Sequence, residues 1–367
     1  MLRTPSSPLL IDVREPHEVA TGILAGARLA PLADLEPRLE TWAVERTRNI
    51  VLYCASGLRS AEGARRLRER GYSAVRSLRG GINEWRRRGL DIAEPPPDAA
   101  LGLSAAQLER YARQMRLAGF GVEGQKRLMG ARVLCVGAGG LGSPASLYLA
   151  AAGVGHIGIV DDDVVALSNL HRQILHGTTG LGTPKTESAA QTLGALNPEV
   201  HVQQYRLRLS AANALEVLAG YDIVLDGSDN FATRYVVNDA ALRLRKPLVF
   251  GAVLRYEGQV AVFTGAPCYR CLFPAPPPAE AAPSCSEAGV LGVVPGIVGT
   301  LQATEVLKLI LGIGESLRAK LLVFDALSMS FSTLTVRADP QCSACGAEVD
   351  RATIELRDVS DSCAGTS

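Results

Sequence analysis

One stretch of the sequence, residues 133–185, constrains the fold more than any other. A short apolar run at 133–136 leads into the glycine-rich motif G-A-G-G-L-G at 137–142 and then into a run of small residues. A second apolar run at 157–160 ends at Asp161. This order predicts a strand, a glycine loop, a helix and a second strand with an acid at its tip, which is typical of a nucleotide-binding βαβ unit.

Each part of this unit has a physical reason to bind a nucleotide. Glycines let the backbone turn tightly and approach a phosphate closely, and the first N–H groups of the following helix point at the anion. Asp161 is placed to accept hydrogen bonds from ribose hydroxyl groups. A dehydrogenase would fit these features as well as any other nucleotide-dependent enzyme does.

Two cations after Asp161 favour an enzyme that cleaves a triphosphate. Arg172 and Lys185 follow the acid closely in the sequence. Charge builds on phosphates as they separate, and cations there lower the barrier, whereas a nicotinamide-dependent oxidoreductase has no evident use for two of them. The alternative is that each is a surface cation on a solvated helix.

Composition excludes several classes of protein. The chain has 367 residues, of which 47% are hydrophobic, so it is long enough for two or three domains. A formal net charge of +1 argues against a general nucleic-acid binder. We expect no membrane span, because no sufficiently long apolar run is found, and residues 1–8 lack a signal-peptide pattern, so a cytoplasmic protein is expected.

A cysteine loop in the N-terminal part indicates sulfur chemistry. An apolar run at 49–53 predicts a strand that ends at Cys54, and Arg59 and Ser60 close the loop that follows. We expect Ser60 to cap the next helix. Converging N–H groups, the helix N-terminus and the charge of Arg59 would all favour a thiolate or a persulfide anion on Cys54. The alternative is a buried, inert cysteine at a strand end.

Three motifs in this part carry a family resemblance. They are D-V-R-E at 12–15, the loop at 54–60 and G-G-I-N-E-W at 80–85. With them, residues 9–91 resemble the rhodanese family of sulfurtransferases. The resemblance implies an α/β domain in which Cys54 carries the sulfane sulfur, with a cysteine desulfurase or thiosulfate as the persulfide donor.

A proline-rich segment marks the clearest domain boundary. The residues E-P-P-P-D at 94–98 form a stiff, extended spacer. We therefore expect an N-terminal domain at 1–93, a linker at 94–102, a second domain at 103–348 and a C-terminal tail at 349–367.

Another acidic motif is predicted where a later strand ends. The apolar run at 221–225 leads into D-G-S-D-N at 226–230, and doubly wound sheets bind ligands at the carboxyl ends of their strands. Asp229 is therefore a candidate ligand for Mg²⁺, directly or through water. As an alternative, Ser228 or Asp229 caps the following helix.

Four of the eight cysteines form two C-x-x-C pairs. Cys268 and Cys271 make the first pair, and Cys342 and Cys345 make the second. Two such pairs predict a closed, tetrahedral and structural Zn²⁺ site. The alternative is two independent redox pairs. Cys285 has no such partner, and its proline- and alanine-rich setting predicts either a thiol that reaches a substrate or a bystander.

The motifs of the second domain together carry a more specific resemblance. They are R-Y-A-R-Q at 110–114, the glycine loop, Asp161, S-N-L-H-R-Q at 168–173, Lys185, D-G-S-D-N at 226–230, both C-x-x-C pairs and C-S-E-A-G-V at 285–290. With them, residues 103–347 resemble the MoeB/ThiF branch of the ubiquitin-activating-enzyme superfamily. The resemblance implies a Rossmann-like domain that uses MgATP to adenylate the C-terminal glycine of a ubiquitin-like sulfur-carrier protein ending in Gly-Gly.

The same resemblance implies roles for individual residues. Those expected at ATP are Gly140, Asp161, Ser168, Asn169, Leu170, His171, Arg172, Lys185, Asp229 and Asn230. A homodimer is implied, in which Arg113 reaches the phosphates bound to the other subunit. Cys285 matches the cysteine that receives the activated carrier in some members.

The chemistry of the residues supports this reaction independently of the family resemblance. A carboxylate is a poor acyl donor, but its attack on the α-phosphorus of ATP makes an acyl-adenylate with a good leaving group. Arg113, Arg172, Lys185 and Mg²⁺ would neutralise the charge. A persulfide then displaces AMP, and a thiocarboxylate results.

Several alternatives stay open at this point. Molybdopterin, thiamine, cysteine and thio-tRNA pathways all use such carriers, and the sequence does not choose among them. The other functions considered are an activating enzyme for a protein-conjugating ubiquitin-like modifier, an enzyme adenylating a tRNA base, and a nicotinamide-dependent oxidoreductase.

Overall fold

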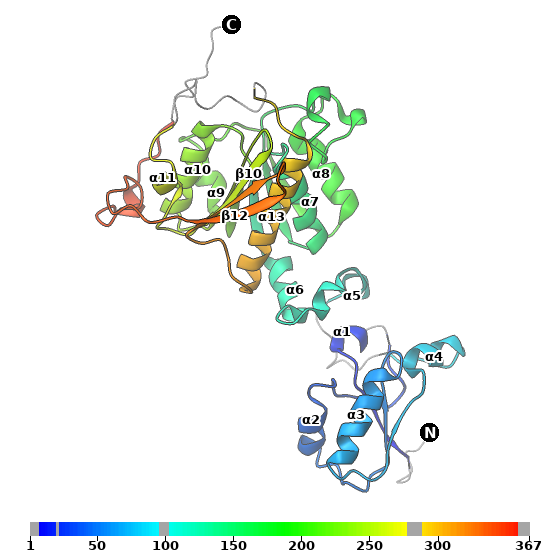
Figure 1. Cartoon of the computed structure of the whole chain (residues 1–367). Helices are drawn as coiled ribbons and strands as arrows, with labels where there is room; N and C mark the ends of the chain where they lie inside the picture. The colour runs from blue at the N-terminus through cyan, green and yellow to red at the C-terminus, as the bar shows by residue number, and fades with distance from the viewer. Residues whose placement is uncertain (1–6, 20–21, 95–102, 277–287, 359–367) are drawn as a thin grey trace. The chain divides into compact units, whose positions relative to one another are not determined.

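The computed structural model of the chain describes residues 7–19, 22–94, 103–276 and 288–358. The chain forms two compact units, Met1–Val122 and Glu123–Ser367 (Figure 1). The division falls later than the expected linker at 94–102, nearly all of which lies outside the described residues. The domain boundaries expected from the sequence therefore stay predictions.

The first unit is built on a four-stranded parallel sheet with the strand order β2-β1-β3-β4. Its strands are β1 (Leu9–Asp12), β2 (Arg28–Leu29), β3 (Ile50–Tyr53) and β4 (Val75–Ser77). Its helices include α1 (Pro16–Val19), α2 (Leu35–Thr41), α3 (Leu58–Glu69), α4 (Gly81–Arg87), α5 (Ala105–Tyr111) and the 3-10 helix η2 (Gln114–Arg116).

Both faces of this small sheet are buried. Ile50 and Leu52 of β3 belong to one apolar cluster with residues of α2 and α3. Tyr53 belongs to a second cluster with Ile82 of α4. A strand buried on both sides needs apolar residues at successive positions, which is why β3 reads as a continuous apolar run.

The second unit contains an eight-stranded sheet with the order β12-β11-β10-β9-β8-β5-β6-β7. Its strands are β5 (Arg132–Val136), β6 (His156–Val160), β7 (His201–Tyr205), β8 (Ile223–Asp226), β9 (Leu248–Leu254), β10 (Glu257–Phe263), β11 (Lys320–Asp325) and β12 (Ser330–Thr335). Strands β7, β6, β5, β8 and β9 are parallel, and β10, β11 and β12 extend the sheet in antiparallel pairs. The strand order reverses around β5, and such a point is where doubly wound sheets bind ligands.

Helices cover both faces of this sheet. They include α6 (Gly121–Gly130), α7 (Gly142–Ala152), α8 (Lys185–Leu196), α9 (Ala214–Ala219), α10 (Phe231–Arg243), α11 (Tyr269–Leu272) and α13 (Val293–Leu311). The 3-10 helices η3 (Leu167–Asn169), η4 (Thr178–Gly180) and η6 (Arg351–Thr353) lie in the connections. Figure 1 shows α7, α8 and α13 on one side of the sheet and α9 and α10 on the other. The predicted α/β architecture of both parts is confirmed.

One helix of the described residues, α13, is long and apolar enough to cross a membrane by length and composition. The sequence predicts no membrane span, and polar residues such as Gln302 and Glu305 interrupt the apolar run of this helix. Both side chains are buried, and the helix packs against α7, β9 and β10. It forms a wall of the domain in this structure.

Two segments show local structure that their sequence motifs do not reveal. Within the motif at 110–114, α5 ends at Tyr111 and η2 begins at Gln114, so Arg113 lies in the connection between them. The first part of the predicted tail at 349–367 packs against the domain, because Ile354 is buried against the cysteine pairs. Polar composition alone does not reveal such a docked segment.

Candidate functional site

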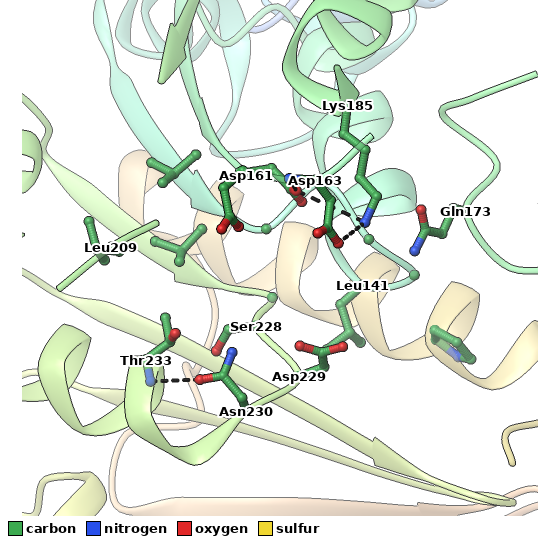
Figure 2. Close-up of a pocket in the computed structure, with 18 of the residues that line it drawn as sticks. Leu141, Asp161, Asp163, Gln173, Lys185, Leu209, Ser228, Asp229, Asn230 and Thr233 are labelled. Atoms are coloured by element: carbon green, nitrogen blue, oxygen red, sulfur yellow. Dashed lines mark hydrogen bonds and ion pairs between the residues drawn. The ribbon is translucent and has the colours of Figure 1, made fainter. Parts of the chain in front are cut away.

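A cavity of about 290 Å³ lies at the carboxyl ends of β5, β6 and β8. The glycine loop, the acids after β6 and the motif at 226–230 line it, and Pro295 of α13 contributes a wall. In Figure 2, Asp161, Asp163 and Lys185 gather on one side of this cavity, and Ser228, Asn230 and Thr233 gather on another. Of the residues expected at ATP, the cavity brings together Gly140, Asp161, Arg172, Lys185, Asp229 and Asn230.

Glycines are required where the loop meets helix α7. Gly137 has a φ of +92°, which favours glycine. A Cβ atom added at Gly142 would overlap the carbonyl oxygen of Gly137. The loop therefore closes tightly on the first turn of α7, and it leaves backbone N–H groups near the cavity, as phosphate binding needs.

Asp161 also holds the glycine loop. Its Oδ2 atom accepts a hydrogen bond from the Ala138 N–H at 2.8 Å, and its Oδ1 atom accepts one from the Asp163 N–H at 2.9 Å. Burial raises the pKa of Asp161, and the nearby Lys185 opposes this shift. Each oxygen has a further lone pair, so the carboxylate can still accept a hydrogen bond from a ribose hydroxyl.

Lys185 is buried at the first residue of α8. Its Nζ atom donates to Asp163 Oδ2 at 2.8 Å and lies 4.0 Å from Asp161 Oδ1. An ammonium group has three donors, so Lys185 can keep a carboxylate partner and still bind a phosphate.

Arg172 is held by the residues that precede it. Its guanidinium donates to Asn169 Oδ1 at 3.0 Å and to the Ser168 carbonyl at 3.3 Å, and it contacts His171 Nε2 at 2.8 Å. Ser168, Asn169, Leu170 and His171 do not line the cavity. In this structure, the contacts of Ser168, Asn169 and His171 orient Arg172, and a direct contact of these residues or Leu170 with ATP stays a prediction.

His176, which the sequence analysis did not single out, braces the glycine loop. Its Nε2 atom lies 2.9 Å from the Ala138 carbonyl oxygen, and its Nδ1 atom lies 2.9 Å from Ser188 Oγ on α8. Burial lowers its pKa, so the neutral ring donates from Nε2 to the carbonyl and accepts at Nδ1 from the hydroxyl.

The side chains of the motif after β8 have two kinds of role. Some form hydrogen bonds that hold the local backbone, and Asp229 is left open to the cavity. Asp226 is buried and accepts hydrogen bonds from the Ser228 N–H and hydroxyl groups at 2.9 and 2.6 Å. Asn230 caps α10 by accepting from the Thr233 N–H at 2.8 Å, so the alternative that Ser228 or Asp229 is the cap is wrong. Asp229 is exposed, and it makes no hydrogen bond or ion pair with any described residue. Its carboxylate therefore fits a hard cation such as Mg²⁺.

The four paired cysteines converge into one cluster, although the pairs are far apart in the chain. Their sulfur atoms lie within 4.8 Å of one another, with 3.7 Å between Cys268 and Cys342 and 3.4 Å between Cys271 and Cys345. Zn–S bonds of about 2.3 Å in a tetrahedron place sulfurs roughly 3.8 Å apart. The donor set and its spacing therefore fit Zn²⁺, and two independent redox pairs are disfavoured.

Two of the four clustered cysteines resist ionisation in the absence of a cation. Burial, and then the neighbouring Cys342, raise the pKa of Cys268 to about 12, and burial and Cys268 raise that of Cys345. A bound Zn²⁺ would compensate for several thiolates in one place.

Hydrogen-bond donors surround the sulfur of Cys54 in the first unit. The Gly57 N–H lies 3.0 Å from Sγ, and the Ser60 hydroxyl lies 3.6 Å from it. Burial raises the pKa of Cys54, but hydrogen bonds from Ser60, Gly57 and Ser56 outweigh burial, so the net pKa is lowered. The cysteine is thus buried, and its surroundings favour the thiolate.

The structure corrects two expectations for the loop that follows Cys54. Helix α3 begins after Gly57, whose φ is +99°, so Gly57 is the N-cap residue and Ser60 instead directs its hydroxyl at Cys54. Arg59 forms a bidentate ion pair with Glu18, at 2.6 and 2.7 Å. Its charge is therefore largely balanced by a carboxylate, and backbone N–H groups and Ser60 carry most of the stabilisation of a sulfur anion.

Buried Arg14 holds the backbone of Glu18 in place. Its guanidinium is bound to Asp12, with a shortest distance of 2.6 Å, and it donates to the carbonyls of Glu18 and Gly22 at 2.9 and 2.7 Å. The D-V-R-E motif at 12–15 thus anchors the segment that faces the cysteine loop.

Comparison with known families matches both parts of the chain. A model described as the ThiF family matches residues 111–344, and a model described as a rhodanese-like domain matches residues 1–88. The first match covers more than half of the chain. The chain belongs to the ThiF family. The predicted order of a rhodanese-like domain and a ThiF-type domain is confirmed. The predicted class of enzyme, an adenylyltransferase with sulfurtransferase activity, is confirmed by relatives that carry these names.

Curated relatives are similar to about two thirds or more of this ThiF-family chain. The sulfur carrier protein adenylyltransferase of Thermus thermophilus is 57% identical over 249 residues, which cover 66% of this chain and 92% of the relative. The SAMP-activating enzyme E1 of Haloferax volcanii is 50% identical over 265 residues, which cover 72% and 98%. The probable adenylyltransferase/sulfurtransferase MoeZ of Mycobacterium tuberculosis is 52% identical over 252 residues, and the matched region covers 67% of this chain and 64% of MoeZ.

A solved structure supports the fold of the ThiF-family domain. The structure of E. coli MccB with AMPCPP and MccA superposes with a TM-score of 0.57 at 23% identity, and it covers 65% of this chain and 74% of that chain. At this identity the likeness shows the fold alone.

The roles of Cys285 and Arg113 stay predictions. Cys285 lies outside the described residues, and Arg113 belongs to the first unit, whereas the residues that line the cavity belong to the second.

Several lining residues were not singled out from the sequence, namely Gln173, Arg208, Thr233 and Arg234. Gln173 was visible inside the S-N-L-H-R-Q motif, but no signal there distinguished its role.

Replacing one cluster cysteine should remove zinc. We expect about one Zn²⁺ per chain in the wild-type protein, and Cys345→Ser should lose the metal and lower the melting temperature, because metal binding contributes directly to folding. Elemental analysis and thermal unfolding measure both effects. Cys135→Ala, which changes a buried cysteine outside the cluster, should keep zinc. A wild-type protein free of zinc after preparation without chelators would contradict this prediction.

The Ser60 hydroxyl should set the reactivity of Cys54. The thiolate reacts with iodoacetamide, so the rate rises as pH passes the thiol pKa, and a lowered pKa makes the wild type reactive at lower pH than an ordinary thiol. Ser60→Ala should move the midpoint upward, because it removes the side-chain hydrogen bond to the sulfur. The label on the Cys54 peptide, followed by mass spectrometry, gives the rate. Ser73→Ala, an exposed serine that bonds the Arg46 carbonyl, serves as control, and an unchanged midpoint in Ser60→Ala would refute the assignment.

Proposed function

We propose that the chain adenylates the C-terminal glycine of a ubiquitin-like sulfur-carrier protein with MgATP and then helps to convert that glycine into a thiocarboxylate. The observation that carries the proposal is the cavity, which combines a glycine loop suited to phosphate with Lys185, Arg172 and Asp229. The carboxylate of Asp229 forms no hydrogen bond or ion pair with any described residue. The names of the relatives support an adenylyltransferase that acts on a sulfur carrier.

In the first step, a carboxylate oxygen of the carrier attacks the α-phosphorus of ATP. The bond from this phosphorus to the bridging oxygen breaks, and pyrophosphate leaves with the electron pair. Negative charge builds on the phosphoryl oxygens, where Lys185 and Arg172 would neutralise it. Mg²⁺, when bound, supplies further positive charge, and Asp229 is the residue that would hold it.

In the second step, a persulfide on Cys54 displaces AMP. The terminal sulfur attacks the acyl carbon, the bond to AMP breaks, and an acyl disulfide between carrier and Cys54 forms. A second thiolate then attacks the Cys54 sulfur of this disulfide, which releases the carrier thiocarboxylate and leaves Cys54 in a new disulfide that a thiol reductant must reduce before the next cycle. The N–H groups around Cys54 support this role, because they stabilise a sulfur anion in either form.

Other parts of the proposal concern partners. We propose a homodimer in which Arg113 acts on the phosphates of the other subunit, and a cysteine desulfurase or thiosulfate as the source of sulfur. Cys285 is proposed to act on the activated carrier. Cytoplasmic localisation fits a protein that works with reduced thiols.

A second function is favoured by one relative, which is named an activating enzyme E1. Activation of a protein-conjugating ubiquitin-like modifier would use the same adenylation chemistry with a different protein. A nicotinamide-dependent oxidoreductase would instead transfer hydride, and it would show no pyrophosphate exchange.

Adenylation should appear as carrier-dependent exchange of pyrophosphate into ATP. Lys185→Ala and Asp229→Ala should each lower the exchange rate by about a hundredfold or more, because each removes charge stabilisation at the phosphates. Lys126→Ala, which removes an exposed cation paired with Glu123, should retain the wild-type rate. Exchange at the wild-type rate in both folded cavity variants would reject the proposed site.

Sulfur transfer should depend on Cys54 separately from adenylation. Cys54→Ala should keep pyrophosphate exchange and lose thiosulfate-dependent thiocarboxylation, because only the second step needs the persulfide. Mass spectrometry of the carrier detects the replacement of one oxygen by sulfur. Cys285→Ala should also keep exchange. If Cys54→Ala forms thiocarboxylate at the wild-type rate, the first unit is not the sulfur donor.

A further inference from the structure

Arg59, the cation of the sulfur loop, is bound by Glu18 through both of its terminal nitrogens. Nη1 donates to Oε2 at 2.6 Å, and Nη2 donates to Oε1 at 2.7 Å. Both carboxylate oxygens take part, which is the bidentate geometry in which a guanidinium and a carboxylate bind most strongly. The side chains of Arg59 and Glu18 are 36% and 11% exposed, so water and salt screen the pair incompletely.

Glu18 is itself held in a fixed position. Its Oε2 atom also accepts a hydrogen bond from the Glu15 N–H at 3.1 Å, and its backbone carbonyl accepts from Arg14 Nη1 at 2.9 Å. Arg14 is buried and bound to Asp12. Releasing Arg59 would leave the Glu18 carboxylate mostly buried and without its partner, which is costly. The ion pair is therefore a stable part of the fold.

Other carboxylates add negative charge around this pair. The hydrogen bond to Glu18 raises the pKa of Arg59, burial opposes this shift, and the charges of Cys54 and Glu15 add to it, so both groups lie within electrostatic reach of the guanidinium. Burial raises the pKa of Glu15, Arg59 opposes the shift, and Glu18 and Asp34 add to it. The single positive charge of Arg59 is thus shared among several acids close to Cys54.

Sulfur donors differ in the charge that they bring to such a site. In loading from a persulfide R–S–SH, the Cys54 thiolate attacks the outer sulfur, the S–S bond breaks, and R–S⁻ leaves with the electron pair, while the proton stays on the new Cys54 persulfide. In loading from thiosulfate, the same attack releases sulfite, but a dianion must approach a thiolate. Like charges repel, so the second reaction needs a cation that is free to balance the donor.

We propose that Glu18 is a specificity-determining residue, which withdraws the charge of Arg59 from anionic donors and so makes the Cys54 loop select a persulfide over thiosulfate. The inference rests on the proposed function, because it takes Cys54 as the site that accepts sulfur. Thiosulfate still loads Cys54, but it needs a higher concentration than a persulfide does. The thiolate itself does not depend on Arg59, because the donors at Gly57 and Ser60 are neutral.

The test measures how fast each donor loads Cys54 of the full chain, without ATP or carrier. The donors are thiosulfate, glutathione persulfide and a cysteine desulfurase charged with a persulfide, so a small and a protein-bound source are compared. Mass spectrometry of the Cys54 peptide detects the added sulfur atom, and donor titrations separate the half-saturating concentration from the maximal rate.

Freeing Arg59 should improve the use of thiosulfate selectively. Glu18→Gln keeps an acceptor oxygen but removes the charge, and it should lower the half-saturating thiosulfate concentration about tenfold or more. Loading by either persulfide should change by less than about threefold. Glu18→Ala should act in the same direction, and it replaces Glu18→Gln if that variant does not melt cooperatively.

Two controls isolate the ion pair. Glu62→Gln removes one negative charge from the same unit, where Glu62 pairs with Arg65 and Arg66, and it should leave loading by each donor within about twofold. The double variant Glu18→Gln/Arg59→Ala should lose the gain, because the gain comes from the freed guanidinium.

Several results would overturn the inference. They are a folded Glu18 variant that needs as much thiosulfate as the wild type, an equal gain in Glu62→Gln, a gain that persists in the double variant, and a wild type that uses thiosulfate at the same concentration as a persulfide. A wild-type chain that none of the donors loads would instead overturn the proposed role of Cys54 in sulfur transfer.

Discussion

The close contact between the glycine loop and the start of α7 is the constraint on which the nucleotide cavity depends. No side chain fits at Gly142, because a Cβ would overlap the Gly137 carbonyl oxygen. The loop is also tied from two other directions, by Asp161 at the Ala138 N–H and by His176 at the Ala138 carbonyl. A loop held at both polar groups of one residue keeps its remaining N–H groups in place, and such preorganisation is what stabilises charge that develops during a reaction.

In each unit, a cation at the candidate site forms an ion pair with a carboxylate of the chain itself. Lys185 is held by Asp163, and Arg59 is held by Glu18. A long side chain that is already oriented loses less freedom when it binds an anion, so these carboxylates position the cations while they reduce the local charge. The sulfur loop differs from the nucleotide cavity in this respect, because neutral donors, chiefly Ser60 and Gly57, account for most of its effect on Cys54.

Helix α10 connects the nucleotide cavity with the cysteine cluster. Its N-cap residue Asn230 and Arg234 in its first turn line the cavity. Further along, Asn238 Oδ1 accepts from the Tyr269 N–H at 2.9 Å, directly after Cys268. Asp239 forms an ion pair with Arg270 at 2.7 Å, between the first two cysteines. A metal at the cysteine cluster would therefore stabilise α10, the same helix that borders the cavity. The metal would support the cavity through this helix, without contacting the ligand.

The sequence by itself determined the features that depend on neighbouring residues. The glycine loop, the two C-x-x-C pairs and the cysteine loop each carry their chemistry within a short stretch, so the fold class and most candidate residues could be predicted. Only the tertiary structure decided which polar groups are paired and which are not. Glu18 and Arg59 are 41 positions apart, and His176 and Ala138 are 38 positions apart. Local sequence does not encode such contacts, because they arise only when distant segments are packed against one another.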